Sequence, residues 1–74
     1  MLEQMTILER ARRLVERLSP APICDECIAQ TIAEPAVDQV QISVREFAIE
    51  RGFARENDAC SLCGQRTMVT TKRA

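Results

Sequence analysis

Four cysteines are the residues of this sequence whose type and spacing point most directly to chemistry. They form two pairs with two residues between the members, Cys24 with Cys27 and Cys60 with Cys63. This spacing lets both sulfurs of a pair reach one ion from a single turn, and two such pairs complete a tetrahedron. We therefore expect one zinc ion in a four-cysteine site. Gly64 follows the second pair and favours a turn with a positive φ angle, in which backbone N–H groups approach the sulfurs.

Three other uses of the cysteine pairs remain open. A redox-active pair would call for a βαβ setting like that of thioredoxin, which the helix-rich pattern of this chain does not suggest. Two disulfides would need an oxidising compartment. An iron–sulfur cluster or a single iron ion uses similar ligands, and the sequence does not distinguish iron from zinc. Zinc is the interpretation that we carry forward.

The expected zinc is structural rather than catalytic. Four protein ligands close the coordination sphere and leave no position for a water nucleophile. The chain contains no histidine, which is the commonest general base. Asp25 and Glu26 lie beside the first cysteine pair, but carboxylates at a helix start usually interact with the helix dipole. We expect a protein that is not an enzyme and has no small-molecule substrate.

The size of the chain makes a stabilising metal useful. The sequence has 74 residues, with no Trp or Tyr and only two Phe. A domain of this size buries only about 60% of the surface that its unfolded chain exposes. Small scaffolds of this kind often gain the missing stability from a metal or from disulfides. We expect a single domain over residues 1–74, held together by the zinc.

Charge indicates the compartment and the class of partner. Residues 1–18 carry seven charged side chains, which fits neither the apolar stretch of a signal peptide nor a membrane span. We expect a cytoplasmic protein without membrane association, in which thiols stay reduced. The formal net charge of −1 becomes about −3 when four thiolates hold one divalent ion. Binding of nucleic acid would therefore need a local basic patch.

Residues 1–18 predict an amphipathic helix in front of the first cysteine pair. Thr6 and Glu9 match the capping box, so the well-formed part begins near Ile7. The inward stripe follows helical spacing, with Ile7, Leu8, Ala11, Leu14, Val15 and Leu18 as its members. Two prolines within residues 19–22 stop this helix.

Two further helices are expected between the cysteine pairs. A short one starts around the first pair and runs to about Ala33. Pro35 fits the first position of a longer helix, which continues through Arg51 and ends at Gly52, a residue suited to a left-handed cap. The inward stripe of this third helix consists of Val37, Val40, Val44, Phe47 and Ala48.

The segment after Gly52 predicts a β-hairpin. Residues 53–55 and 67–71 have the composition of short strands, and the second cysteine pair lies between them. Residues 72–74 are expected to form a disordered tail. The fold class is therefore α+β: a small three-helix domain with a C-terminal β-hairpin, stapled by a four-cysteine zinc site.

This order of elements resembles the winged helix-turn-helix domains of bacterial regulators. The resemblance lies in residues 28–33, 40–48 and 49–56 and extends over about residues 7–71. Ala29 is similar to the small residue where two helices cross, and residues 51–55 are similar to the junction between recognition helix and wing. Most winged helices contain no metal. Here the zinc would tie the start of the second helix to the wing.

The resemblance implies binding of double-stranded DNA and a role in transcription regulation. The third helix would then be the recognition helix, whose candidates for contacts to base edges are Gln39, Gln41 and Arg45. Candidates for phosphate contacts from the side of the wing are Arg55, Arg66, Lys72 and Arg73. An ordinary solvated helix would show similar polar residues.

Ile42 and Ile49 support an alternative function. They lie one heptad apart on the face of the third helix that would meet DNA, together with acidic Asp38 and Glu46. An exposed apolar pair marks a protein contact more often than a base contact. The alternative is a zinc-stapled module that binds a protein partner or forms a homodimer, unless both isoleucines are buried. A positive surface around the third helix would support nucleic acid, and an apolar or acidic surface would support protein.

Overall fold

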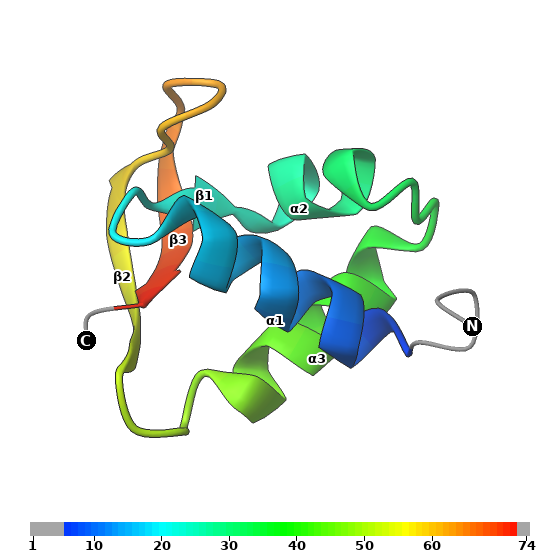
Figure 1. The fold of residues 1–74 in the computed structure, drawn as a ribbon. Coiled ribbons are helices and arrows are strands. Elements are labelled where there is room, and N and C mark those ends of the chain that lie inside the picture. Colours follow the sequence, from blue (N-terminus) through cyan, green and yellow to red (C-terminus); the bar gives the residue numbers. More distant parts are fainter. Residues whose placement is uncertain (1–5, 73–74) are drawn as a thin grey trace.

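A computed structural model describes residues 6–72 of the chain. Three helices lie beside a three-stranded antiparallel sheet (Figure 1). The elements follow in the order α1 (Ile7–Leu18), β1 (Ile23–Cys24), α2 (Asp25–Thr31), α3 (Val37–Phe47), β2 (Phe53–Ala59) and β3 (Arg66–Lys72). The α+β class, the three helices and the hairpin are confirmed. Among the residues described, no helix is long and apolar enough to cross a membrane.

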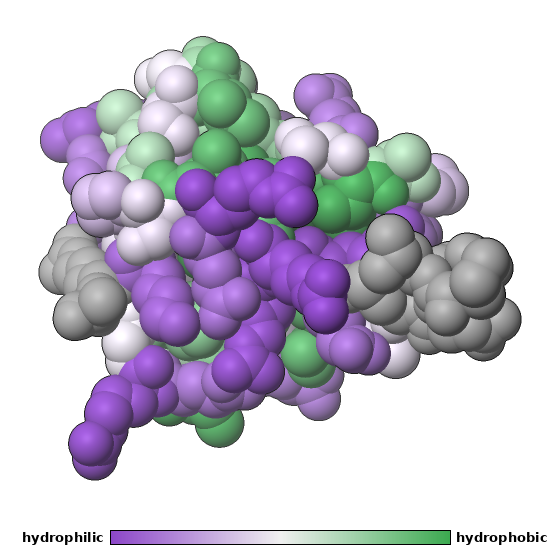
Figure 2. All heavy atoms as spheres, viewed as in Figure 1, coloured by the Kyte–Doolittle hydropathy of each residue, from purple (hydrophilic) through white to green (hydrophobic). Residues whose placement is uncertain are grey.

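Helix α1 begins where the capping box predicts. The hydroxyl oxygen of Thr6 accepts a hydrogen bond from the backbone N–H of Glu9 at 3.1 Å, which satisfies one of the free donors at the helix start. The helix packs against α3 and β3, and Ala11 and Val15 are fully buried. Figure 2 shows hydrophilic side chains gathered over the middle of the face in front of α1. The amphipathic pattern of this helix is therefore confirmed.

Helix α2 ends at Thr31, slightly earlier than expected. The N–H of Glu34 donates to the carbonyl of Ala29 at 2.8 Å, and the N–H of Ala33 donates to that of Gln30 at 3.1 Å. These two bonds form a Schellman motif, whose turning residue adopts a left-handed conformation. Ala33 takes that position with a φ of 58°, although its Cβ makes the conformation unfavourable.

Helix α3 is shorter than expected at both ends. It begins at Val37 rather than Pro35, because the carbonyl of Ala36 accepts the first helical bond, from Val40 at 3.2 Å. It ends at Phe47, four residues before the expected end at Arg51.

The early end of α3 follows from the packing of the two phenylalanines. Two tight turns, from Phe47 to Glu50 and from Glu50 to Phe53, reverse the chain. The rings of Phe47 and Phe53 then meet edge to face with centroids 5.1 Å apart, a favourable geometry for aromatic pairs. Gly52 has the expected positive φ, 94°, but it serves the turn into β2 and does not cap the helix.

The sheet has the strand order β1-β3-β2. In the hairpin, β2 and β3 pair over their full length, from Phe53 opposite Lys72 to Ala59 opposite Arg66. The strand β1 pairs with the other edge of β3, where Ile23 lies opposite Thr70. The sequence did not predict β1, because two residues are too few to show an alternating pattern.

The strand β3 extends into the segment predicted to form a disordered tail. Lys72 is the last residue of β3, and its ammonium group lies 3.2 Å from the carboxylate of Glu16 on α1. The prediction of a disordered tail is therefore wrong for Lys72, because strand pairing and this ion pair fix its place. Residues 73–74 lie outside the part that the structure describes.

The core lies between the helices and the sheet. Its buried aliphatic side chains come from all three helices and from β1 and β3. Phe47 adds one buried aromatic ring to them. The predicted inward stripe of α3 is confirmed for Val40, Val44 and Phe47, which are buried. Val37 is partly buried against the core, and Ala48 lies just beyond the end of the helix. The far end of the hairpin, residues 61–66, is exposed to solvent and depends on other interactions for its position.

Candidate metal centre

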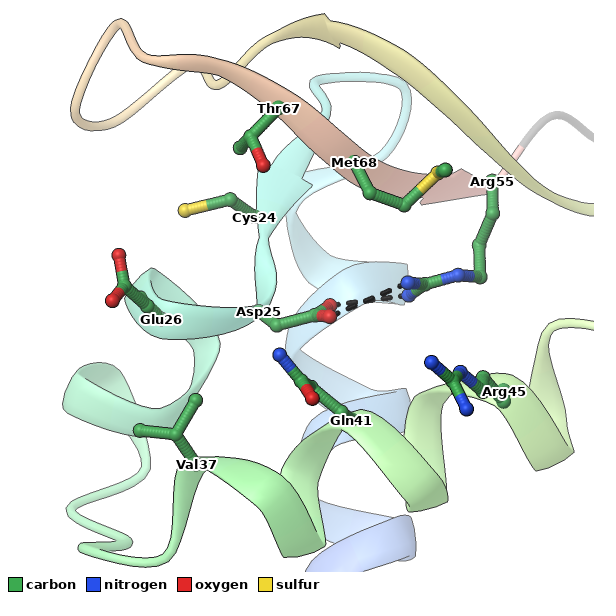
Figure 3. A pocket seen from close by; sticks show the side chains of 9 residues that line it. All are labelled: Cys24, Asp25, Glu26, Val37, Gln41, Arg45, Arg55, Thr67 and Met68. Carbon is green, nitrogen blue, oxygen red and sulfur yellow. Dashed lines mark hydrogen bonds and ion pairs between the residues drawn. The ribbon is translucent and has the colours of Figure 1, made fainter.

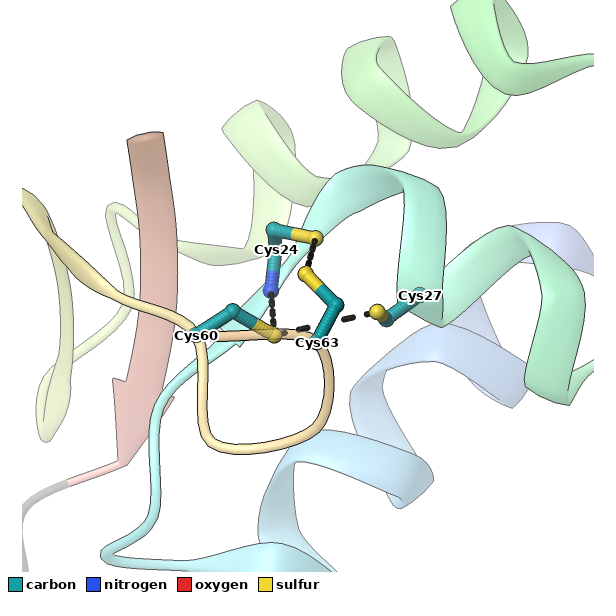
Figure 4. Close-up of side chains that lie close together, drawn as sticks. All are labelled: Cys24, Cys27, Cys60 and Cys63. Atoms are coloured by element: carbon teal, nitrogen blue, oxygen red, sulfur yellow. Dashed lines mark hydrogen bonds between the residues drawn. The ribbon is translucent and has the colours of Figure 1, made fainter. Parts of the chain in front are cut away.

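The two cysteine pairs come from segments far apart in the sequence and meet beside the start of α2. Cys24 ends β1 and precedes α2, and Cys27 lies in the first turn of that helix. Cys60 directly follows β2, and Cys63 lies in the turn before β3. Figure 4 shows the four side chains converging on one point. One half of the site is at a helix start and the other in the hairpin turn, as the sequence predicts.

The sulfur positions fit a single tetrahedral ion. All four sulfurs lie within 4.8 Å of one another. The separation is 3.8 Å between Cys24 and Cys63 and 3.7 Å between Cys27 and Cys60. A tetrahedron with zinc–sulfur bonds of about 2.3 Å has edges of about 3.8 Å, close to these values. The same separations are far longer than the ~2.05 Å of a disulfide. The four cysteines can thus hold one metal ion, consistent with a single structural zinc.

The turn that carries the second pair is fixed by backbone hydrogen bonds. The sulfur of Cys60 accepts from the N–H groups of Cys24 and Leu62, each at 3.4 Å. The carbonyl of Cys60 accepts a hydrogen bond from the N–H of Gly64, and the N–H of Cys60 donates to the carbonyl of Gln65, both at 2.9 Å. Gly64 has the expected positive φ, 76°. Donors aimed at a metal-bound sulfur offset part of its negative charge, so this turn suits a thiolate ligand.

The same contacts give the cysteine thiols different pKa values. Burial raises the pKa of Cys60, but backbone N–H groups, among them those of Cys63, Cys24 and Leu62, outweigh burial and bring this pKa from 9.0 to about 6. Burial raises the pKa of Cys24, and burial together with the neighbouring thiols raises the pKa of Cys27. Without a cation the cluster favours one thiolate, at Cys60. A divalent ion would supply the positive charge that the other sulfurs need in order to ionise.

Two sets of contacts connect the cluster to the rest of the fold. Ser61 donates from its N–H (2.9 Å) and its hydroxyl (2.5 Å) to the carbonyl of Pro22, just before β1. Asp25, next to Cys24 in the chain, is only 8% exposed. It binds both terminal nitrogens of Arg55, at 3.1 and 3.3 Å. Arg55 also donates to the hydroxyl of Thr70 at 3.0 Å, so the cysteine cluster and the sheet share one polar corner.

Within residues 6–72, the cations predicted to contact DNA do not form an unpaired basic patch. Three of them form ion pairs: Arg55 with Asp25 at 3.1 Å, Arg66 with Asp58 at 3.6 Å, and Lys72 with Glu16 at 3.2 Å. Gln39, Gln41 and Arg45 are exposed on α3 as expected. Arg73 lies outside the described residues. Of the predicted cations within residues 6–72, Arg45 alone has no carboxylate partner.

The two isoleucines of the predicted partner surface are both exposed. Ile42 is 51% and Ile49 is 88% exposed, which excludes the alternative that both are buried. Ile49 lies in the turn after α3, so the prediction that the two share one helix face is wrong. Leu62 and Met68 are also exposed and did not enter the predicted site. Figure 2 shows hydrophobic side chains gathered at the β2–β3 turn, the turn that carries Leu62.

A groove lies beside the metal centre, between α3 and the hairpin (Figure 3). Its volume is about 530 Å³. The first turn of α2, the outer side of α3 and both strands of the hairpin contribute side chains to it, including the cysteine ligand Cys24 and the Asp25–Arg55 ion pair. This groove could not be predicted from the sequence, because its walls come from segments that only tertiary packing brings together.

Comparisons with known proteins add no relative to this picture. No protein-family model matches the chain, and no curated protein or solved structure shows significant similarity to it.

Proposed function

We propose that this chain is a zinc-stabilised protein-interaction module on a winged-helix-like scaffold, with α3 and the hairpin as its interaction face. The observation that carries this proposal is the character of the α3 surface. Its apolar residue Ile42 is half exposed. The charges around it are mixed, since Asp38 and Glu46 are exposed beside Arg45. A surface with exposed apolar side chains and no excess of cations suits a protein better than a polyanion.

The arrangement of helices and hairpin supports the scaffold. Two helices, a turn, a third helix and a hairpin follow in the order that the winged helix-turn-helix resemblance implies. The strand β1 adds a pairing between the start of α2 and β3. The metal centre links the same two regions, since Cys24 lies in β1 and Cys63 precedes β3. In this proposal the zinc holds the hairpin at a fixed angle to α3, so that both present one surface.

The ion pairs argue against a polyanion as the main partner. Affinity for DNA comes largely from Lys and Arg side chains that neutralise phosphates. Arg55, the least exposed of the paired cations, would have to leave Asp25, which is itself almost buried. Separating such a pair is costly because it leaves a poorly solvated carboxylate behind. A metal centre with four thiolates and one divalent ion adds about two negative charges nearby.

Photo-crosslinking tests the proposal. A benzophenone amino acid replaces Ile42 in the full chain, produced in its native cells. The matched control carries it at Arg13, an exposed residue of α1. We expect protein adducts from position 42 and none from position 13. The absence of adducts at position 42, or adducts to nucleic acid alone, would overturn the proposal.

DNA binding is the second candidate function. It rests on the same order of elements and on the exposure of Gln39, Gln41 and Arg45 along α3. This candidate predicts that the zinc-loaded protein shifts a labelled duplex mixture at low salt and that the affinity falls steeply as salt is added. An unshifted duplex at low salt would remove it.

A further inference from the structure

The groove between α3 and the hairpin has a chemistry that points to one kind of occupant. We propose that it binds a segment of a partner protein that carries a carboxylate close to an apolar side chain. This inference rests on the proposed interaction function and names the site and the partner chemistry. Nothing in the zinc site itself requires such a groove, because the four sulfurs converge without it.

The groove has the size of a binding site. Its volume of about 530 Å³ falls within the ~300–1,000 Å³ of typical ligand pockets. Val37 on α3 and Met68 on β3 provide its apolar lining. Met68 is 42% exposed. Methionine is a flexible apolar side chain that adapts its shape to a bound group. An apolar side chain of the partner would cover it.

The charges of the groove are unevenly distributed. Asp25 and Arg55 neutralise each other through two hydrogen bonds. Figure 3 places Arg45 at the end where the Arg55 guanidinium lies, and Glu26 at the opposite end beside Cys24. Arg45 has no ion pair within residues 6–72, so one positive charge remains uncompensated at its end of the groove. A guanidinium binds a carboxylate through two parallel hydrogen bonds.

A peptide backbone also finds a partner in the groove. The side chain of Gln41 extends from α3 toward Asp25 in Figure 3, and no hydrogen bond of its amide occurs within the described part of the chain. An amide offers both donor and acceptor groups, the pair that one peptide unit can satisfy. Gln41, Arg45 and Met68 thus offer a backbone contact, a charge contact and an apolar contact around one space.

A nucleic acid fits this groove less well. A phosphate could also bind Arg45, but a polyanion continuing along the groove would meet Glu26 and then the thiolates of the metal centre. Repulsion of the phosphates by the carboxylate of Glu26 and by the thiolates opposes binding. A single carboxylate flanked by uncharged residues avoids this repulsion, and so the observations favour a protein segment.

Selection from a random peptide library tests the inference. Zinc-loaded full-length protein is exposed to phage-displayed dodecapeptides, and the affinity of an enriched synthetic peptide is measured by fluorescence polarisation. We expect enriched peptides to share an Asp or Glu close to an apolar residue. Arg45→Glu should weaken binding at least about tenfold, the usual effect of losing a hydrogen-bonded charge contact. Met68→Ala should weaken it severalfold, and Arg13→Glu on α1 should leave it unchanged.

A charge reversal sharpens the test. Replacing the acidic residue of the peptide by Lys should restore binding to the Arg45→Glu variant. Circular dichroism and zinc content, unchanged in each variant, show that the fold is intact. Failure to enrich any peptide, enrichment of peptides without acidic residues, or equal binding to Arg45→Glu would overturn the groove proposal. Protein crosslinks at position 42 would still stand in that case, whereas Arg45-dependent binding of duplex DNA would overturn both.

Discussion

Adding a strong chelator to the zinc-loaded protein removes the ion that links the start of α2 to the turn between β2 and β3. A domain of 74 residues, at ~0.05–0.15 kcal/mol per residue, has a total stability of about 4–11 kcal/mol. Zinc-finger peptides gain about 10–16 kcal/mol from their metal at neutral pH. The metal term is therefore as large as the whole stability of the domain. We expect the metal-free chain to have a free energy of unfolding near or below zero.

The structure indicates which parts respond first. The turn at residues 61–65 is exposed, so without the metal it is held to the fold by hydrogen bonds, such as those of Ser61 to Pro22, and by the strands on either side of it. Cys60 is 3% exposed and its sulfur accepts two backbone N–H groups, whereas Cys63 is exposed. Replacement by serine should therefore destabilise the fold more at Cys60 than at Cys63.

Circular dichroism melting curves and two-dimensional amide NMR spectra, recorded before and after chelation, measure this effect. We expect loss of the cooperative transition and of amide dispersion, both restored by added zinc. Ser61→Ala is the matched control inside the same turn, because it removes one exposed hydrogen bond, worth about 0.5–1.5 kcal/mol, and no ligand. A metal-free protein that melts cooperatively with native-like dispersion would refute the reasoning.

Three further predictions concern the cap of α2, the polar corner and the thiols. Ala33→Gly should raise the free energy of unfolding by about 1 kcal/mol, because the left-handed φ of 58° suits glycine; urea denaturation of the zinc-loaded protein measures it, and a loss of stability would contradict it. Asp25→Asn should lower the free energy of unfolding by about 1–3 kcal/mol in the same assay, because the guanidinium of Arg55 loses its carboxylate partner. The side chain of Arg55 is only 18% exposed, so water replaces that partner poorly. Unchanged stability would show that the ion pair contributes little. Zinc affinity should fall at least about 100-fold per pH unit on acidification, because Cys24 and Cys27, whose pKa values are raised, must each release a proton to bind. Competition titrations at several pH values test this, and a slope below two protons would disagree with it.

Features with a local physical cause could be predicted from the sequence. The hydrogen bond between Thr6 and Glu9 joins residues one helical turn apart, and the capping-box pattern predicts it directly. The positive φ of Gly64 follows from the turn between Cys63 and β3. The two cysteine pairs work in the same way, since each spans a single turn, and their convergence follows from the preference of zinc for four ligands.

Features set by tertiary packing could not be predicted in this way. The end of α3 depends on the contact between Phe47 and Phe53, which requires the chain to leave the helix early. The strand β1 exists because Ile23 finds Thr70 on β3, and no pattern within two residues signals that pairing. Propensity is a weak guide where such contacts decide the outcome.

The ion pairs explain why the surface chemistry was harder to predict than the metal site. Arg55 is a free cation in the sequence, but folding brings it to Asp25, which lies 30 positions earlier in the chain. The same holds for Lys72 and Glu16. A count of charges along the chain therefore overstates the cations available to a polyanion.

The placement of the cysteines also has a consequence for the rate of folding. Each pair is complete within one turn, so either can capture an ion in the unfolded chain, but 32 residues separate Cys27 from Cys60. Closing a loop of that length costs about 3–4 kcal/mol of chain entropy. With one ion per chain, the bonds that form between the captured metal and the second cysteine pair offset this entropic cost. With excess zinc, separate ions would occupy the two pairs, and one must dissociate before the chain can close.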